Sequence, residues 1–221
     1  MILETSGANL FYEKKGSGMP IILLHGNGGS HKAFRKTTAI LKKHFAVYAV
    51  DMRCHGKSSR TRELHYSSMA DDIKEFICLL KLKKPVVYGF SDGGIVALLL
   101  SIKYPNLLSE IIVSGVNTHP TGLKNPWLTL FKALYFITKS PKFKLLIGEP
   151  NISDDMLSTI KIPVHITAGS KDIVHQAHLQ NIANKIKSST LTILSGETHS
   201  SYVVKKHHIA NYILNKIHKS K

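Results

Sequence analysis

The feature that most constrains the fold is an alternation between short apolar runs and longer amphipathic stretches. Six runs have the length and the β-branched content of buried strands: residues 21–25, 45–50, 85–90, 110–115, 163–168 and 190–195. Helical patterns lie between several of them, at residues 68–80, 93–104 and 174–186, and a further one follows the last run, at residues 200–217. Near-continuous apolar strands that alternate with helices are typical of a parallel sheet covered by helices on both faces. The sequence therefore predicts an α/β fold.

The first residues follow a different pattern. Two short strand-like segments flank Ser6-Gly7-Ala8-Asn9, which predicts an antiparallel hairpin at the edge of the sheet. The whole chain has 221 residues and is 43% hydrophobic, enough for one domain with a substantial core or for a domain with a modest insertion.

One interval interrupts the alternation, because no strand pattern occurs from residue 117 to residue 161. Prolines break this interval, and the apolar positions of its helical pattern are Trp127, Leu130, Phe131 and Leu134. An excursion of this length is usually functional or an element of its own. We therefore predict a short helical lid at residues 117–161, inserted into an α/β core formed by residues 1–116 and 162–221. An ordinary pair of packing helices is the alternative.

Ser91 lies in the stretch Gly89-Phe90-Ser91-Asp92-Gly93, which follows a strand and opens a helix. This strand, sharp turn and helix form the setting of a nucleophile elbow, in which a strained serine projects its hydroxyl from the sheet. Close packing at such a turn admits only glycine-sized residues two positions before and after the serine, and the sequence meets that demand. We predict that Ser91 is a nucleophile, with a plain turn serine as the alternative.

A serine hydroxyl needs a general base and a group that orients this base. His199 follows the last predicted strand, and Asp172 follows the strand before it. The carboxyl ends of parallel strands share one edge of the sheet, so both side chains are expected near Ser91. Asp172 could instead serve only as a helix N-cap. Asp154 or Asp155 is the fallback if the orienting acid lies elsewhere.

A glycine-rich loop, His25-Gly26-Asn27-Gly28-Gly29-Ser30, follows the first long strand. Such a loop can turn backbone N–H groups toward a developing oxyanion. We assign the two oxyanion donors to the backbone N–H groups of Asn27 and Asp92. The loop lacks the Lys-Ser/Thr pair of a phosphate-binding loop and the full dinucleotide fingerprint. No cofactor is therefore expected.

Composition limits the partners. The formal net charge is +16, but only four of the 30 cationic residues are arginines, and the lysines are scattered along the chain. Proteins that recognise nucleic acid specifically depend on bidentate arginine contacts, so no nucleic-acid partner is expected. The lysines could form a solvated surface, and a face that binds another partner is the alternative. Cys54 and Cys78 form no metal-binding motif, so no metal is expected. Without a predicted membrane span or signal peptide, we expect a cytoplasmic protein.

Five segments in order, HGNGGS, DMRCHGKSS, GFSDGG, AGSKD and GETHS, resemble the α/β-hydrolase fold superfamily of serine hydrolases. GFSDGG, followed further on by Tyr104-Pro105, is most similar to small esterases, haloperoxidase-like and valacyclovir-hydrolase-like members. One departure is Cys54, which stands where the family often has glycine. The lid is also short for the family, which suggests an open or shallow pocket.

The resemblance implies a hydrolase that cleaves a small-molecule carboxylic ester through an acyl-enzyme. The same triad can also perform perhydrolysis, lactone opening, amide cleavage or carbon–carbon bond hydrolysis, and some relatives only bind ligands. We expect the apolar side of the lid, with Trp127, Leu130, Phe131 and Leu134, to line the substrate pocket; packing within the lid is the alternative. The Asp92 carboxylate has two open roles: interaction with the positive end of its helix, or recognition of a substrate amine as in the valacyclovir-hydrolase-like relatives.

Overall fold

The computed structural model describes residues 1–205 and 208–219. Its strands form one sheet in the order β1-β2-β4-β3-β5-β6-β7-β8. The strand bounds are β1 Ile2–Glu4, β2 Asn9–Lys15, β3 Pro20–Leu24, β4 Ala46–Val50, β5 Val86–Phe90, β6 Ile111–Ser114, β7 Val164–Lys171 and β8 Ser189–Thr198. The pairs from β4 to β8 are parallel, whereas β1 and β2 form an antiparallel hairpin at one edge. The predicted α/β fold and edge hairpin are confirmed.

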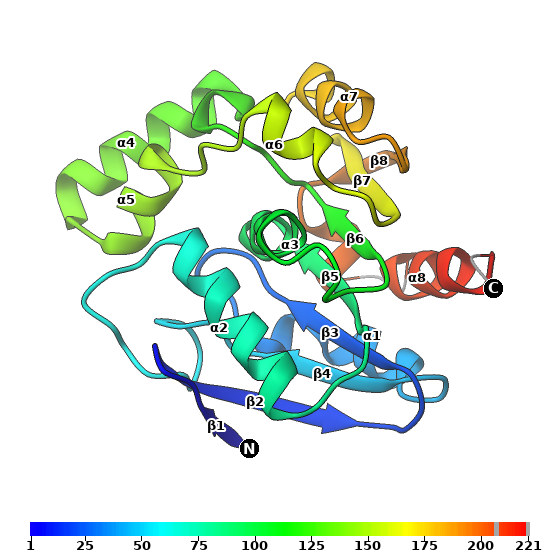
Figure 1. The fold of residues 1–221 in the computed structure, drawn as a ribbon. Helices are drawn as coiled ribbons and strands as arrows, with labels where there is room; N and C mark the ends of the chain where they lie inside the picture. Colours follow the sequence, from blue (N-terminus) through cyan, green and yellow to red (C-terminus); the bar gives the residue numbers. More distant parts are fainter. Residues whose placement is uncertain (206–207, 220–221) are drawn as a thin grey trace.

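Helices cover both faces of the sheet, with α2 and α3 on one side and α1 and α8 on the other (Figure 1). The helix bounds are α1 Arg35–Leu41, α2 Tyr66–Leu79, α3 Asp92–Lys103, α4 Asn125–Thr138, α5 Pro141–Gly148, α6 Asp154–Ser158, α7 Gln176–Lys185 and α8 His208–Lys219. The central strands β3 to β6 are buried along almost their whole length because both faces are covered. This burial accounts for their continuous apolar sequences.

The sequence pattern missed α1 and misplaced several ends. Helix α1, RKTTAIL, has few apolar residues, so it gives only a weak periodic signal although it buries Leu41 against the sheet. Strands β7 and β8 run further than predicted and pair as far as Lys171 and Thr198 across an irregularity. The predicted helix at 200–217 is a short π-helical turn, Ser201–Lys205, followed by α8. Residues 206 and 207 of that prediction lie outside the described residues.

Helices α4, α5 and α6 occupy the interval between β6 and β7 (Figure 1). Helices α4 and α5 contact each other, and the Phe131 and Phe143 rings stack between them at a centroid distance of 6.3 Å. Helix α6 instead contacts α3 and α7 of the core. The part of the interval that projects from the sheet is therefore the α4–α5 pair, which we call the cap.

Candidate active site

Ser91 lies between the end of β5 and the first residue of α3. Its backbone has φ 53° and ψ −116°, a strained conformation for a residue with a side chain. The strain is held by main-chain bonds, because the Ser91 N–H donates to the Ser114 carbonyl and the Ser91 carbonyl accepts from the amides of Gly94 and Ile95. The serine hydroxyl is thereby fixed at the carboxyl edge of the sheet.

The two glycines that flank the elbow have no room for a side chain. A Cβ on Gly89 would lie 2.2 Å from the Gly93 carbonyl oxygen, and one on Gly93 would lie 2.1 Å from the Leu24 carbonyl oxygen. Both distances are far below van der Waals contact, so this turn packs tightly enough to require glycine at each position. The steric demand stated from the sequence is met in the structure.

His199 and Asp172 lie beside this serine. His199 Nε2 is 3.1 Å from Ser91 Oγ, and His199 Nδ1 is 2.7 Å from Asp172 Oδ1. Each of the two residues comes directly after a strand, His199 after β8 and Asp172 after β7. Phe90 packs on the imidazole at a ring-centroid distance of 4.9 Å. The three side chains thus form one hydrogen-bonded chain from carboxylate to hydroxyl.

Asp172 is buried and stays ionised. Burial raises its pKa, but the hydrogen bond and charge of His199 outweigh this effect, so the pKa of Asp172 lies below its ordinary value. The Val174 amide also donates to Asp172 Oδ1, at 3.1 Å. The alternative role as a helix N-cap is wrong, because α7 begins at Gln176 with His175 at the N-cap. A buried carboxylate aimed at an imidazole is suited to fixing the position and tautomer of the ring.

Asn27 lies on the loop after β3, opposite the start of α3. His25 organises this loop: its Nδ1 bonds the Gly26 carbonyl at 2.8 Å, and its Nε2 accepts the Met52 N–H at 3.1 Å. Burial lowers the pKa of His25 to about 4, so the ring is neutral and can donate at one nitrogen while it accepts at the other. Sequence reasoning assigned no role to His25, because its contacts are to backbone groups that only the fold brings near.

The Asp92 carboxylate is turned away from the solvent and is only 1% exposed. The Asn27 side-chain amide donates to its Oδ2 at 2.9 Å and also to the Lys142 carbonyl of α5 at 3.3 Å. The Tyr66 hydroxyl is near enough to interact with this carboxylate, although it lies outside hydrogen-bonding geometry. Burial raises the pKa of Asp92 to about 6 despite the hydrogen bond from Asn27. The carboxylate therefore holds the Asn27 loop in place, and its burial costs the folded protein desolvation free energy.

Because of this desolvation cost, we predict that Asp92→Asn changes the stability of the protein by an amount that depends on pH. Between pH 4 and pH 6 the folded protein keeps a proton on Asp92 that the unfolded chain has lost, so wild-type stability falls as pH rises through this window. An asparagine still accepts the Asn27 hydrogen bond and has no charge to bury. We expect the variant to gain roughly 2–3 kcal/mol in free energy of unfolding at pH 8 and almost nothing at pH 4. Urea unfolding at both values measures this, and an equal effect at both would contradict the account.

A cavity of about 390 Å³ opens beside Ser91 and His199. Its apolar wall comes from the core and the cap; the side chains are Phe90, Leu123, Phe131, Phe143, Leu146 and Ile173. Of the four predicted pocket residues only Phe131 lines this cavity, and the assignment of Trp127, Leu130 and Leu134 is wrong. Trp127 and Leu130 are 42% and 45% exposed. Helix α4 is apolar on nearly every side, so periodicity alone did not show which side faces the cavity.

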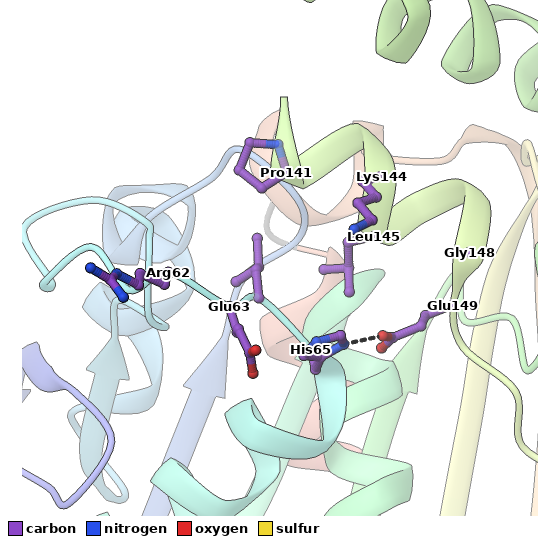
Figure 2. Close-up of a pocket in the computed structure, with 9 residues that line it drawn as sticks. Arg62, Glu63, His65, Pro141, Lys144, Leu145, Gly148 and Glu149 are labelled. Atoms are coloured by element: carbon purple, nitrogen blue, oxygen red, sulfur yellow. Dashed lines mark hydrogen bonds and ion pairs between the residues drawn. The ribbon is translucent and has the colours of Figure 1, made fainter. Parts of the chain in front are cut away.

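A second cavity, of about 270 Å³, lies between α5 and the segment that leads into α2 (Figure 2). Glu149 bridges the two elements: its Oε1 is 2.5 Å from His65 Nδ1, and its Oε2 accepts the Tyr66 N–H at 3.1 Å. Charged side chains also line this cavity, among them Arg62, Glu63 and Lys144. Ser91, Asp172 and His199 do not line this cavity, so we interpret the Glu149 contacts as a structural link between the cap and the core.

One further position, Gly115, shapes the site and was not found from the sequence. A Cβ on Gly115 would lie 2.7 Å from His199 Cε1 and 3.2 Å from Asp172 Oδ2, so this glycine leaves the space that the imidazole fills. Its φ is 58°. Cys54, where the resemblance suggested a glycine, also has a positive φ, of 62°. The chain thus keeps the left-handed turn there although cysteine is a less favourable residue for it.

Known proteins resemble this chain in sequence. A family model described as alpha/beta hydrolase fold matches residues 19–141. The human (Homo sapiens) protein named serine hydrolase BPHL is 28% identical over 234 residues, which covers 91% of this chain and 80% of the human protein. Ethanol acetyltransferase 1 of Cyberlindnera jadinii is 33% identical over 118 residues, covering 52% of this chain. The chain spans about a third of the length of that acetyltransferase, 34%.

Solved structures have the same architecture at low sequence identity. A thermophilic esterase from Thermogutta terrifontis gives a TM-score of 0.82 with 20% identity, covering 99% of this chain and 98% of the esterase. At this identity the similarity concerns the fold alone. It extends from the first strand to the last and includes the cap.

Proposed function

The chain belongs to the alpha/beta hydrolase fold family, and on this premise we propose that it is a serine hydrolase that cleaves small carboxylic esters through an acyl-enzyme. One observation carries the proposal: the hydrogen-bonded chain Asp172–His199–Ser91 ends at the wall of an apolar cavity. A strained serine, a buried acid and an imidazole between them are the parts that acyl transfer requires.

In the proposed reaction Ser91 Oγ attacks the ester carbonyl while His199 Nε2 takes the hydroxyl proton. The negative charge that develops on the carbonyl oxygen is stabilised by the backbone N–H groups of Asn27 and Asp92. Asp92 is the first residue of α3, where an N–H has no partner within the helix. The tetrahedral intermediate collapses, His199 gives its proton to the alcohol, and the acyl group stays on Ser91.

Water completes the cycle. His199, neutral again, takes a proton from a water molecule that attacks the acyl carbonyl, and it then returns this proton to Ser91 as the carboxylic acid leaves. Asp172 stays ionised throughout and stabilises the imidazolium that forms in each half of the reaction. All bonds formed and broken in this scheme involve the substrate, water, Ser91 and the proton that His199 carries, so no cofactor enters it.

A panel of p-nitrophenyl esters of increasing acyl length tests the substrate class. The apolar cavity predicts that kcat/KM rises by roughly fourfold for each added methylene, the effect of burying a group worth about 0.8 kcal/mol, until the acyl chain fills the cavity. A flat profile would show that this cavity does not bind the acyl group. Hydrolysis of a lactone, an anilide or a carbon–carbon substrate in preference to every ester would replace the ester assignment, and no turnover at all would favour a ligand-binding protein.

Amine recognition by Asp92 has its own test. The carboxylate does not line the cavity, and the Asn27 amide occupies its Oδ2. We therefore expect an aminoacyl ester and its N-acetylated analogue to give kcat/KM values within about threefold of each other, because a carboxylate that does not reach the cavity forms no direct ion pair with the substrate amine. A strong preference for the free amine that disappears in Asp92→Asn would contradict this expectation and assign the carboxylate to the substrate.

A further inference from the structure

The outer surface of the cap is apolar. Helix α4 exposes Phe136 and Ile137 at 76% each, together with Leu130 and Trp127. Leu130, Ala133 and Ile137 follow one another at helical spacing on exposed positions, so they form a stripe along one side of the helix. Figure 1 shows α4 as the outermost element of the cap, with α5 between it and the core. Among the described residues, no other element exposes as many large apolar side chains.

The segment that contains the cap is strongly cationic. Residues 111–148 contain no aspartate or glutamate and five lysines: Lys124, Lys132, Lys139, Lys142 and Lys144. Lys132 lies exposed on the flank of the apolar stripe. Lys139 ends α4 and holds its ammonium 4.6 Å from the centre of the Phe136 ring. Apolar and aromatic side chains bordered by lysines are typical of helices that lie in the interface of an anionic membrane.

From these features we propose that the outer face of α4 docks on anionic lipid surfaces. Phe136, Ile137, Leu130 and Trp127 would enter the acyl boundary, and the lysines would remain among the headgroups. None of the helices in the described parts of the chain is long and apolar enough to cross a bilayer, so the contact is peripheral. A second copy of the chain is a poorer occupant, because it would bring one lysine-rich, acid-free face against another.

Docking in this way would also place the active site near the membrane. Phe131 lies on α4 and lines the cavity beside Ser91, while the exposed stripe lies on another side of the same helix. A substrate leaving the lipid phase would then meet the apolar wall of the cavity first. The docking itself does not depend on the proposed ester chemistry, because it is a binding event that vesicles alone can report.

Trp127 offers a direct probe, because it is the only tryptophan in the chain and lies on α4. Its emission is measured as the protein is titrated with phosphatidylcholine vesicles, alone or with about a third phosphatidylglycerol. We expect a blue shift with the anionic vesicles that is much weaker with the zwitterionic ones and is reduced in about 1 M salt, where the screening length falls to about 3 Å. No shift, or equal shifts with both lipids, would overturn the proposal.

Variants separate the contribution of the apolar side chains to vesicle binding from that of the lysines. Phe136→Ser/Ile137→Ser should weaken partitioning at least tenfold, whereas Leu79→Ser, which removes a side chain 53% exposed at the end of α2, should not. Lys132→Gln/Lys139→Gln should weaken binding to anionic vesicles by roughly tenfold, and Lys42→Gln/Lys43→Gln, with the same change in net charge, should not. Equal losses in the controls would overturn the assignment to α4. So would a dimer, seen by sedimentation, that the Phe136/Ile137 variant abolishes while vesicle binding is absent.

Hydrolysis of a soluble p-nitrophenyl ester shows that each variant is folded, since neither pair of α4 residues lines the cavity. Its rate should stay within about twofold of wild type in every variant. If the wild-type protein hydrolyses no ester, circular dichroism replaces this control and the vesicle titration still decides the docking. Failure of the proposed function and failure of the docking are thus distinguishable.

Discussion

Replacement of Ser91 by alanine is expected to lower kcat for ester hydrolysis by roughly 10⁶-fold, the cost of removing the nucleophile from an intact triad. The substitution deletes one oxygen atom that accepts or donates only to His199 Nε2 in the described structure, so the fold should be unaffected. What remains should be a rate of about 10³-fold over water, supplied by the oxyanion donors and by binding. Initial-rate assays with the best ester of the panel measure the loss of kcat.

Ser200 provides the matched control for this variant. It is the second serine beside His199 and also lines the cavity, but its side chain is not in the hydrogen-bonded chain. Ser200→Ala should keep kcat within about tenfold of wild type. If Ser200→Ala abolished turnover and Ser91→Ala did not, the nucleophile would have been assigned to the wrong serine.

The second large effect is expected for Asp172→Asn, which should lower kcat by roughly 10⁴-fold. Asparagine at this position would present an N–H or a neutral oxygen to His199 Nδ1, so the ring would lose the charge that stabilises the imidazolium and could adopt the wrong tautomer. Because the carboxylate does not line the cavity, KM should change much less than kcat. Steady-state kinetics with one ester gives both values.

Asp154→Asn is the control for an acid elsewhere. Asp154 is exposed at the start of α6 and pairs with Lys185 at 3.1 Å, and the structure does not bring it to His199. The sequence left it, with Asp155, as the fallback acid. We expect no measurable change in kcat for this variant. Near-full activity in Asp172→Asn combined with a large loss in Asp154→Asn would move the orienting role to α6.

Much of the architecture could be read from the sequence because it depends on local patterns. Continuous apolar runs such as β3 and β5 are typical of strands with both faces covered, so they indicate a parallel sheet. The elbow around Ser91 is equally local, since its glycines, its strand and its helix are consecutive. Asp172 and His199 could be placed near it because the carboxyl ends of parallel strands share one edge.

What the sequence could not provide depends on contacts between distant segments. Helix α1 has little apolar periodicity, since it buries only a few side chains. Phe143 and Leu146 line the cavity because α5 packs on α4, and no spacing within either helix indicates which side faces Ser91. The bond between the Asn27 amide and the Asp92 carboxylate joins residues 65 positions apart. Such contacts follow from the angle between elements, which single-sequence periodicity does not encode.

Labelling by a fluorophosphonate shows directly whether Ser91 is an activated nucleophile. Wild-type protein is treated with the reagent, its intact mass is recorded, and the modified peptide is mapped. We predict one phosphonyl group per chain, attached to Ser91, with labelling absent in Ser91→Ala and greatly slowed in Asp172→Asn. Attachment to another residue, or labelling that persists in Ser91→Ala, would contradict the account.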